Sequence, residues 1–144
     1  MENLKVSQSP WKRLLRQSER FAKRNQHEAA MELGEEALRR ARQSGAAMPT
    51  IGGILCQLGN IYQALGVWNK ERRSTIAAKR AFAKAGRYYK QALKMSEYAK
   101  GRARSEAIFT TRGNMACLLA NQGHHEKADR MMTLAAMEVV PKPR

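Results

Sequence analysis

Apolar and small residues recur every three to four positions along most of this chain. One such stretch lies between residues 11 and 22, and a second runs from Glu28 to Gln43. The spacing places these positions on one face of an α-helix, whereas the sustained period-two alternation of a β-strand is missing and only 4 residues are Pro. The pattern therefore predicts an all-α protein. The apolar positions of the two stretches are Trp11, Leu14, Leu15, Phe21 and Ala22, then Ala30, Leu33, Ala37, Leu38 and Ala41.

Residues that start and stop helices divide the chain into three helix pairs. Ser9 can cap the first helix and Pro10 can start it, because Pro is tolerated in the first helical turn. The segment 25–27 breaks the first pair in its middle, and Ser44-Gly45 ends it. We expect an N-terminal arm at residues 1–8, helix pairs at 9–44, 50–99 and 105–140, and a tail at 141–144.

The middle pair carries a recognisable motif. A large apolar residue is followed by Leu-Gly and an aromatic residue, then by a Gly and a second aromatic residue, and Ala and Tyr follow in the next helix. This order resembles the tetratricopeptide repeat (TPR), in which small residues let two antiparallel helices approach closely. The residues that occupy the motif are Leu55, Leu58, Gly59, Tyr62, Gly66, Trp68, Ala85, Tyr89, Ala92 and Leu93.

The resemblance implies a fold built from repeats. The first pair is a degenerate repeat, and the third is clearest between residues 113 and 128. The turn residues Asn25, Gly66 and Gly123 lie 41 and 57 residues apart, and the second spacing becomes 43 without residues 71–84, which an ordinary repeat lacks. A period near 42 resembles the subclass found in kinesin light chains and spindle-orientation adaptors. We therefore expect three stacked antiparallel helix pairs in a TPR-type right-handed solenoid with a lengthened middle hairpin.

Residues 71–84 contain neither Pro nor Gly, and two arrangements can accommodate them. In the first, the turn stays at Gly66 and the second helix gains about four turns. In the second, both helices lengthen by about two turns and the hairpin tip moves to residues 73–75. Apolar residues continue on both sides of the insert, which favours the second arrangement. That arrangement places Gly66 and Gly86 inside helices, at a cost of about 1 kcal/mol each relative to Ala.

The formal charge of +15 is large for 144 residues and indicates an acidic or polyanionic partner. Residues 70–104 hold twelve of the 27 basic residues and two of the 12 acidic ones, so the excess forms a patch. The competing interpretation is a solvated helix face that only keeps the protein soluble. The candidates for the basic patch are Arg72, Arg73, Lys79, Arg80, Lys84 and Arg87.

The TPR resemblance also implies a binding groove lined by the first helix of each pair. Carboxamide side chains there can hold the backbone of an extended peptide, because each supplies both donors and an acceptor. The alternative for Asn60 and Asn114 is a hydrogen bond to a neighbouring helix. The carboxylate clamp of chaperone-binding relatives is matched only in part, since Thr110 replaces one of its bases. The groove candidates are Lys12, Arg16, Gln57, Asn60, Gln63, Asn114 and Asn121.

Reactive side chains form no recognisable catalytic or metal-binding motif in the sequence. Cys56 and Cys117 lie in apolar helical contexts outside any CxxC pair, which predicts buried thiols in a reducing compartment, the cytoplasm or an organelle matrix. His27, His124 and His125 fall at turns without further ligands at suitable spacing. We therefore expect no metal, no cofactor and no enzymatic activity. No run of eighteen apolar residues is present, and we expect no membrane span.

Three hypotheses about function remain at this point. We favour a non-enzymatic protein–protein interaction module, an adaptor or scaffold, that binds a peptide or helix in the groove and an acidic surface through the basic hairpin. The alternative is a structural RNA-contacting subunit of a ribonucleoprotein or another large assembly, whose affinity would fall steeply with salt as phosphate contacts are lost. The third is self-association through the long hairpin.

Overall fold

The computed structural model describes residues 9–138, which form six α-helices and one short 3-10 helix. No strand is present in this part of the chain, so the predicted all-α class is confirmed. The predicted arm (1–8), the tail (141–144) and the last two residues of the third pair lie outside the described residues. The elements are α1 (Pro10–Lys23), α2 (His27–Gln43), α3 (Met48–Glu71), α4 (Thr75–Met95), η1 (Ser96–Tyr98), α5 (Gly101–Asn121) and α6 (His125–Met137).

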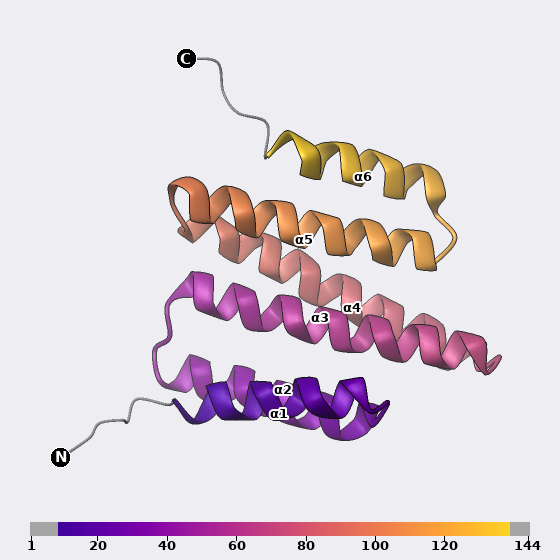
Figure 1. The fold of residues 1–144 in the computed structure, drawn as a ribbon, viewed down its shortest axis with the longest axis horizontal. Helices are drawn as coiled ribbons and strands as arrows, with labels where there is room; N and C mark the ends of the chain where they lie inside the picture. The colour runs from indigo at the N-terminus through magenta and orange to yellow at the C-terminus, as the bar shows by residue number, and fades with distance from the viewer. Residues whose placement is uncertain (1–8, 139–144) are drawn as a thin grey trace.

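Consecutive helices pair into three hairpins, α1–α2, α3–α4 and α5–α6, which stack side by side (Figure 1). Helix α3 contacts both α1 and α5, whereas α2, α4 and α6 make no backbone contact with one another among residues 9–138. The first helices of the hairpins therefore form one layer, the inner layer, and the second helices form the outer layer. In the view of Figure 1 the inner layer lies in front of α2 and α4.

The three hairpins close with the same turn. In each, the second turn residue has a positive φ angle, and the next backbone N–H donates to the carbonyl oxygen five residues earlier, as at helix ends of the Schellman type. Arg73 adopts this conformation with φ 60°, which costs a non-glycine residue about 1 kcal/mol. The middle turn thus lies at residues 72–74, as in the second of the two arrangements considered for the insert. The equivalent residues are Asn25, Arg73 and Gly123.

Helix α5 begins at Gly101, four residues before the start at 105 that the sequence predicts. Gly101 has a φ angle of 58°, and the N–H of Arg104 donates to the carbonyl of Lys100. The glycine therefore reverses the chain after η1 in a conformation that other residues adopt only with strain. Because it starts here, α5 has 21 residues and is longer than its partner α6, which has 13.

Close approach of α3 and α4 organises the middle hairpin. Helix α3 carries Gly52, Gly59 and Gly66 at intervals of seven residues, and all three are buried. A Cβ atom on Gly59 would overlap the ring of Tyr89, and one on Gly66 would overlap the ring of Phe82. Each glycine therefore admits one large α4 side chain against the α3 backbone. The expected cost of Gly66 inside a helix is offset by the packing of the aromatic ring that it admits.

Alanines and a few large side chains fill the remaining core. The most completely buried large side chains are Tyr89 from α4 and three aliphatic residues of α3. Alanine provides the close contacts on the outer helices, because its methyl group occupies little space between neighbouring backbones. The three aliphatic residues are Ile54, Leu55 and Leu58, and the fully buried alanines of α2 and α4 are Ala30, Ala37, Ala41 and Ala85.

Glu35 on α2 links the first hairpin to the second. Its Oε2 atom accepts hydrogen bonds of 2.8 Å from the hydroxyl groups of Tyr62 and of Tyr88, and the Lys84 ammonium lies 3.3 Å away. Burial by itself would raise the pKa of Glu35, but these hydrogen bonds and the charge of Lys84 outweigh it and lower the pKa. The carboxylate therefore stays ionised and joins α2, α3 and α4.

Two glycines of α3, one packed against α4 and one exposed, should respond to replacement by Ala with stability changes of opposite sign. Replacing Gly59 by Ala should destabilise the protein by about 1–3 kcal/mol, because the methyl group overlaps the Tyr89 ring in a filled core. Replacing Gly53 by Ala, on the same helix, should stabilise it by up to about 1 kcal/mol, because no atom outside the helix lies within 4 Å of the added Cβ. Urea unfolding of the two variants measures both changes.

A third variant shows whether the Gly59 effect comes from the aromatic contact. Tyr89→Leu in the Gly59→Ala background should recover part of the lost free energy, since the smaller side chain yields the space that the methyl group needs. Equal destabilisation by Gly53→Ala and Gly59→Ala would contradict the close-approach explanation.

Candidate functional site

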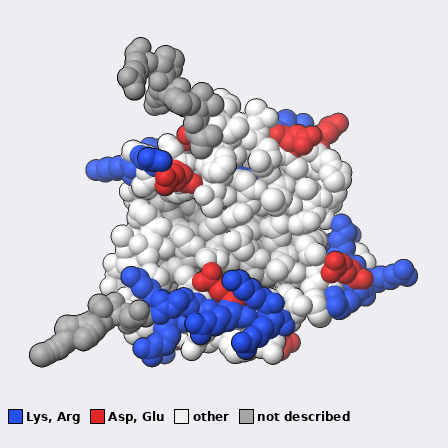
Figure 2. Space-filling model, in the orientation of Figure 1, with Lys and Arg blue, Asp and Glu red and all other residues white. Residues whose placement is uncertain are grey.

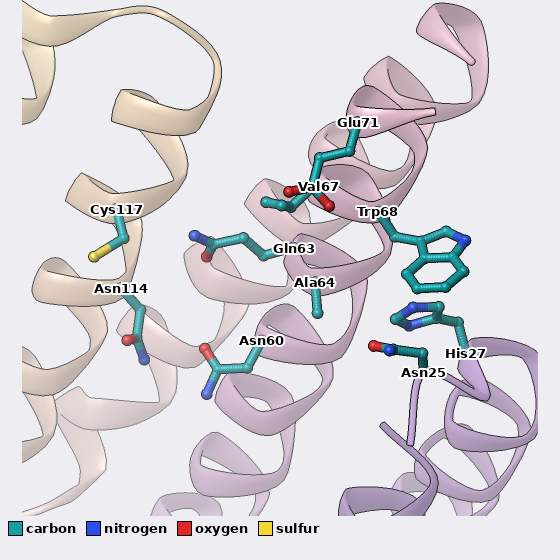
Figure 3. A pocket seen from close by; sticks show the side chains of 10 residues that line it. All are labelled: Asn25, His27, Asn60, Gln63, Ala64, Val67, Trp68, Glu71, Asn114 and Cys117. Carbon is teal, nitrogen blue, oxygen red and sulfur yellow. The ribbon is translucent and has the colours of Figure 1, made fainter. Parts of the chain in front are cut away.

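An open hollow of about 520 Å³ lies between the α1–α2 turn, α3 and α5 (Figure 3). Four carboxamide side chains from these three elements line it, and an apolar end is formed by residues of α3. We call this site the inner hollow. Its lining residues are Asn25, His27, Asn60, Gln63, Ala64, Val67, Trp68, Glu71, Asn114 and Cys117.

Three of the seven groove candidates meet in the inner hollow. Asn60 and Gln63 come from adjacent turns of α3, and Asn114 faces them from α5 (Figure 3). The stacking of α3 beside α5 brings these residues together although more than fifty positions separate them in sequence. Asn25 and Trp68 also line the hollow and were not among the candidates. The repeat pattern could have indicated Asn25, because a hairpin turn of one repeat lies beside the first helix of the next.

The other four candidates lie outside the inner hollow. The Nε2 group of Gln57 donates a 3.1 Å hydrogen bond to Glu19 on α1, and the Lys70 ammonium donates a 2.8 Å bond to the backbone carbonyl of Asn121. Lys12 and Arg16 are exposed on α1, which contacts α3 but does not reach α5. These residues therefore belong to the α1–α3 boundary and to the end of α5.

All three carboxamides that meet in the hollow also make hydrogen bonds to side chains behind it. The Tyr89 hydroxyl lies 2.6 Å from Oδ1 of Asn60 and 2.8 Å from Oε1 of Gln63, so it can donate to either oxygen. Nδ2 of Asn114 donates to the sulfur of Cys56 at 3.1 Å. Asn60 and Asn114 therefore make the hydrogen bonds to neighbouring helices that were considered as the alternative to peptide binding. These hydrogen bonds also fix both side chains in position, which leaves Nδ2 of Asn60 and Oδ1 of Asn114 to face the hollow.

Charge is distributed unevenly over the inner face. Figure 2 shows a broad surface without charged residues over α3 and α5, and a dense group of Lys and Arg along the lower edge, over α1. The basic patch predicted from the sequence lies at residues 70–104, so this group is separate from it, and two of its members, Lys12 and Arg16, were groove candidates. Its members, all exposed, are Lys12, Arg13, Arg16, Arg20, Lys23 and Arg24.

The six predicted members of the basic patch do not form one surface. Arg72 stacks on Trp68, with Cζ 3.1 Å from the ring centroid, and Lys84 pairs with Glu35. Arg73 lies exposed at the hairpin tip. The remaining three, Lys79, Arg80 and Arg87, are exposed along α4 in the outer layer. Intramolecular contacts therefore reduce the patch that the sequence predicts to a row of bases on α4.

His27 is the first residue of α2 and packs against the end of α3. It is 7% exposed, its ring lies 5.3 Å from that of Trp68, and Arg72 covers Trp68 as well. Burial, and then the positive charge of Arg72, lower the pKa of His27. Neither ring nitrogen has a hydrogen-bond partner among the described residues. The imidazole is therefore neutral at pH 7 and lies at the wall of the inner hollow.

The two cysteines differ in environment. Cys56 is partly buried, and burial raises the pKa of its thiol. Cys117 is exposed, so the prediction of a buried thiol is wrong for this residue, because position 117 of α5 faces the inner hollow. Within residues 9–138, no three His, Cys, Asp or Glu side chains gather closely enough to hold a metal ion. None of the helices in this range has both the length and the apolar character needed to cross a membrane.

His27 makes stability depend on pH. Its folded pKa lies below the ordinary value of 6.5, so the unfolded chain binds a proton more readily, and stability present above pH 6.5 is lost as the pH falls toward the folded pKa. His27→Phe should remove this loss between pH 7 and 5. It should also stabilise the protein at pH 7 by about 1 kcal/mol, because two unpaired nitrogens are no longer buried. Thermal unfolding at several pH values measures both effects.

A matched substitution isolates the buried histidine. His125 is also the first residue of a helix but is exposed. His125→Phe should leave the slope of stability against pH unchanged. If His27→Phe keeps the slope of the parent protein, the lowered pKa of His27 is not its source.

Comparison of the chain with protein-family models, curated proteins and solved structures gives no match in any of the three. The TPR resemblance therefore rests on the sequence motif of the middle hairpin. The features of this protein that bear on its function are the inner hollow, the charged surfaces and the packing of the three hairpins.

Proposed function

We propose that this protein is a non-enzymatic interaction module of the TPR type, whose inner layer binds an extended peptide of a partner protein. The observation that carries the proposal is the convergence of four carboxamides from the α1–α2 turn, α3 and α5 on one hollow. Carboxamides match the donors and acceptors of a peptide backbone without requiring a particular side chain. The stacking of three similar hairpins with their first helices on one side supports the solenoid arrangement that such modules have.

The fixed orientations of Asn60 and Asn114 suit one peptide unit. Asn60 uses Oδ1 toward Tyr89 and presents Nδ2, which can donate to a peptide carbonyl. Asn114 uses Nδ2 toward Cys56 and presents Oδ1, which can accept from a peptide N–H. A donor on α3 and an acceptor on α5 are therefore both held in place before a ligand arrives. Such preorganisation lowers the entropic cost of binding.

The rest of the hollow specifies the partner further. Ala64, Val67 and the edge of Trp68 form an apolar end that accepts one apolar side chain of the peptide. The surface over α3 and α5 is uncharged, so binding at the hollow itself should depend little on salt. The exposed bases of α1 lie along the edge of the same face and attract acidic residues that flank the bound segment.

One observation favours the alternative, an RNA-contacting subunit. Six exposed basic residues lie within fifteen positions at the start of the fold, five of them on α1. Each phosphate that they neutralise would add to the salt dependence of binding. The inner face between these bases and α5 offers Trp68 as an aromatic residue, but Arg72 covers its ring and His27 packs against it with the ring planes tilted. Because these intramolecular contacts occupy part of the ring that a base would stack on, the peptide is the better supported ligand.

The proposal predicts how peptide binding responds to substitutions in the hollow. Short random peptides displayed on phage are selected against the full chain, and the affinity of a selected peptide is measured by fluorescence anisotropy. Asn114→Ala and Asn60→Asp should each weaken it roughly tenfold, or about 1.4 kcal/mol. Asp at position 60 keeps an oxygen for the Tyr89 hydroxyl and removes only the donor that faces the hollow.

The control removes a carboxamide from elsewhere on the surface. Gln91 is exposed on α4 in the outer layer, and Gln91→Ala should leave the affinity unchanged. Selected peptides that bind Asn114→Ala and the parent protein equally well would exclude the inner hollow as their site. Tight binding of single-stranded RNA that is lost above physiological salt, with no peptide selected, would favour the ribonucleoprotein alternative.

A further inference from the structure

A second hollowed surface borders another face of α5, where α5 lies beside α4. Two hollows of about 490 and 430 Å³ lie between α4 and the α5–α6 hairpin, and they share Phe82 and Gln122 as lining residues. They are therefore adjacent, and together we call them the outer groove. Along α4 it runs from Thr75 to Lys90, a distance of about 22 Å at 1.5 Å per residue.

The floor of the outer groove is apolar. Phe82 and Leu118 are 4% exposed and form its base, and three partly buried side chains from α5 and α6 complete it. Gly86 lies on the α4 wall and contributes no side chain to the groove. A Cβ on Gly86 would lie 3.6 Å from Leu118, which is an ordinary contact, so close helix packing does not require glycine at this position. The three partly buried residues are Met115, Leu119 and Met131.

The rim of the outer groove is basic. Lys79, Arg87 and Lys90 line it from α4, all three are exposed, and none forms an ion pair or hydrogen bond within residues 9–138. Lys70 and His124 stand at one end, and no acidic side chain lines either part of the groove. These bases are therefore the part of the predicted basic patch that remains available to a partner.

We infer that the outer groove docks an amphipathic helix of a partner protein whose apolar face is flanked by Asp and Glu residues. The groove length matches a helix of four turns. An apolar floor takes the leucine-type side chains at positions i, i+3, i+4 and i+7, and the bases along α4 pair with the acidic flank. The occupant is a protein segment, because the floor of the groove is apolar and its one Phe, Tyr or Trp side chain, Phe82, is buried and offers no ring face to a nucleic acid base.

This inference is independent of peptide binding at the inner hollow. The two surfaces border different faces of α5 and have no lining residue in common. The Asn60→Asp and Asn114→Ala variants should therefore bind the helix as the parent protein does. A helix that binds the parent chain and fails to bind these variants would place its site on the inner face and overturn the inference.

The test uses a library of acidic amphipathic helices displayed against the full chain. The library fixes Leu at i, i+3, i+4 and i+7, and varies the flanking positions among Asp, Glu, Gln and Ala. Selected helices should carry Asp or Glu on one flank, and their affinity should fall as salt rises. Failure to select any helix, or selection of helices without acidic residues, overturns the inference.

Two variants locate the bound helix. Gly86→Leu fills the groove with a side chain that the α4 backbone accommodates, and it should weaken binding at least about tenfold. Gly113→Leu adds the same bulk to α5 at a position with no atom within 4 Å outside the helix and should have no effect. Equal affinity of the two variants overturns the inference.

Charge reversal provides the second line of evidence, with a control that changes the net charge equally. Replacing Lys79, Arg87 and Lys90 by Glu should weaken binding at least about tenfold and remove the salt dependence. Replacing Arg13, Arg20 and Arg24 by Glu alters the α1 side of the protein and should leave the affinity within about twofold. These residues are exposed, so both triple variants are expected to fold. If binding instead follows net charge alone, or a single-stranded RNA oligomer binds and is lost only with the α4 reversal, the groove is a polyanion site and the inference fails.

Discussion

The packing of α4 aromatic rings against α3 glycines is the constraint on which the rest of this structure depends. Gly59 and Gly66 lie seven residues apart, as do Tyr89 and Phe82, and the two sets meet in antiparallel order. Two helix turns separate successive members of each set, so the contacts repeat along a single seam. Because the rings lie against the bare α3 backbone, the helices approach more closely than side chains of ordinary size would allow. The middle hairpin, whose helices contact both neighbouring hairpins, is thereby held together along its length.

The same seam connects the core to the inner hollow. Tyr89 belongs to the outer layer, yet it passes beside Gly59 and its hydroxyl reaches Asn60 and Gln63 in the inner layer. Burial of the ring raises the pKa of Tyr89, so the hydroxyl keeps its proton and remains a donor. The oxygen of Asn60 is thus fixed by a core residue, which orients the amide group toward the hollow. Loss of the glycine would displace the ring and, through it, the carboxamide.

The helical class and the length of the middle hairpin could be predicted, because both follow from the spacing of apolar residues. The stripe formed by residues such as Leu58 and Leu65 continues past the motif, which is why the turn at residues 72–74 could be favoured over one at Gly66. The turn geometry that the three hairpins share could not be predicted. Arg73 occupies the position that Gly123 fills in the third hairpin, and an arginine gives no indication of a positive φ angle. The close approach of α4 to α3 does carry a sequence signal, because Gly52, Gly59 and Gly66 recur every seven residues along α3.

Charge was harder to place than fold, because sequence counts ignore pairing. Lys84 contributes to the basic excess of residues 70–104, yet Glu35 from another hairpin pairs with it. Arg72 likewise covers Trp68 beside a buried histidine. The carboxamides of the inner hollow were partly predictable from their repeat positions, whereas Asn25 and His27 enter it only because the first turn lies against α3. A surface is therefore identified by the bases that remain unpaired after folding, and on α4 these lie beside an apolar groove.

The two candidate surfaces depend on the seam between α3 and α4 and have no lining residue in common. Tyr89 supports the inner hollow from behind, and Phe82, two turns earlier on α4, forms the floor of the outer groove. Both rings are anchored against α3 glycines, so neither can move far without repacking the middle hairpin. A ligand in one site would therefore leave the geometry of the other largely unchanged. If both proposed sites bind their ligands, the middle hairpin would hold two partners at once, and it offers little means for one partner to displace the other.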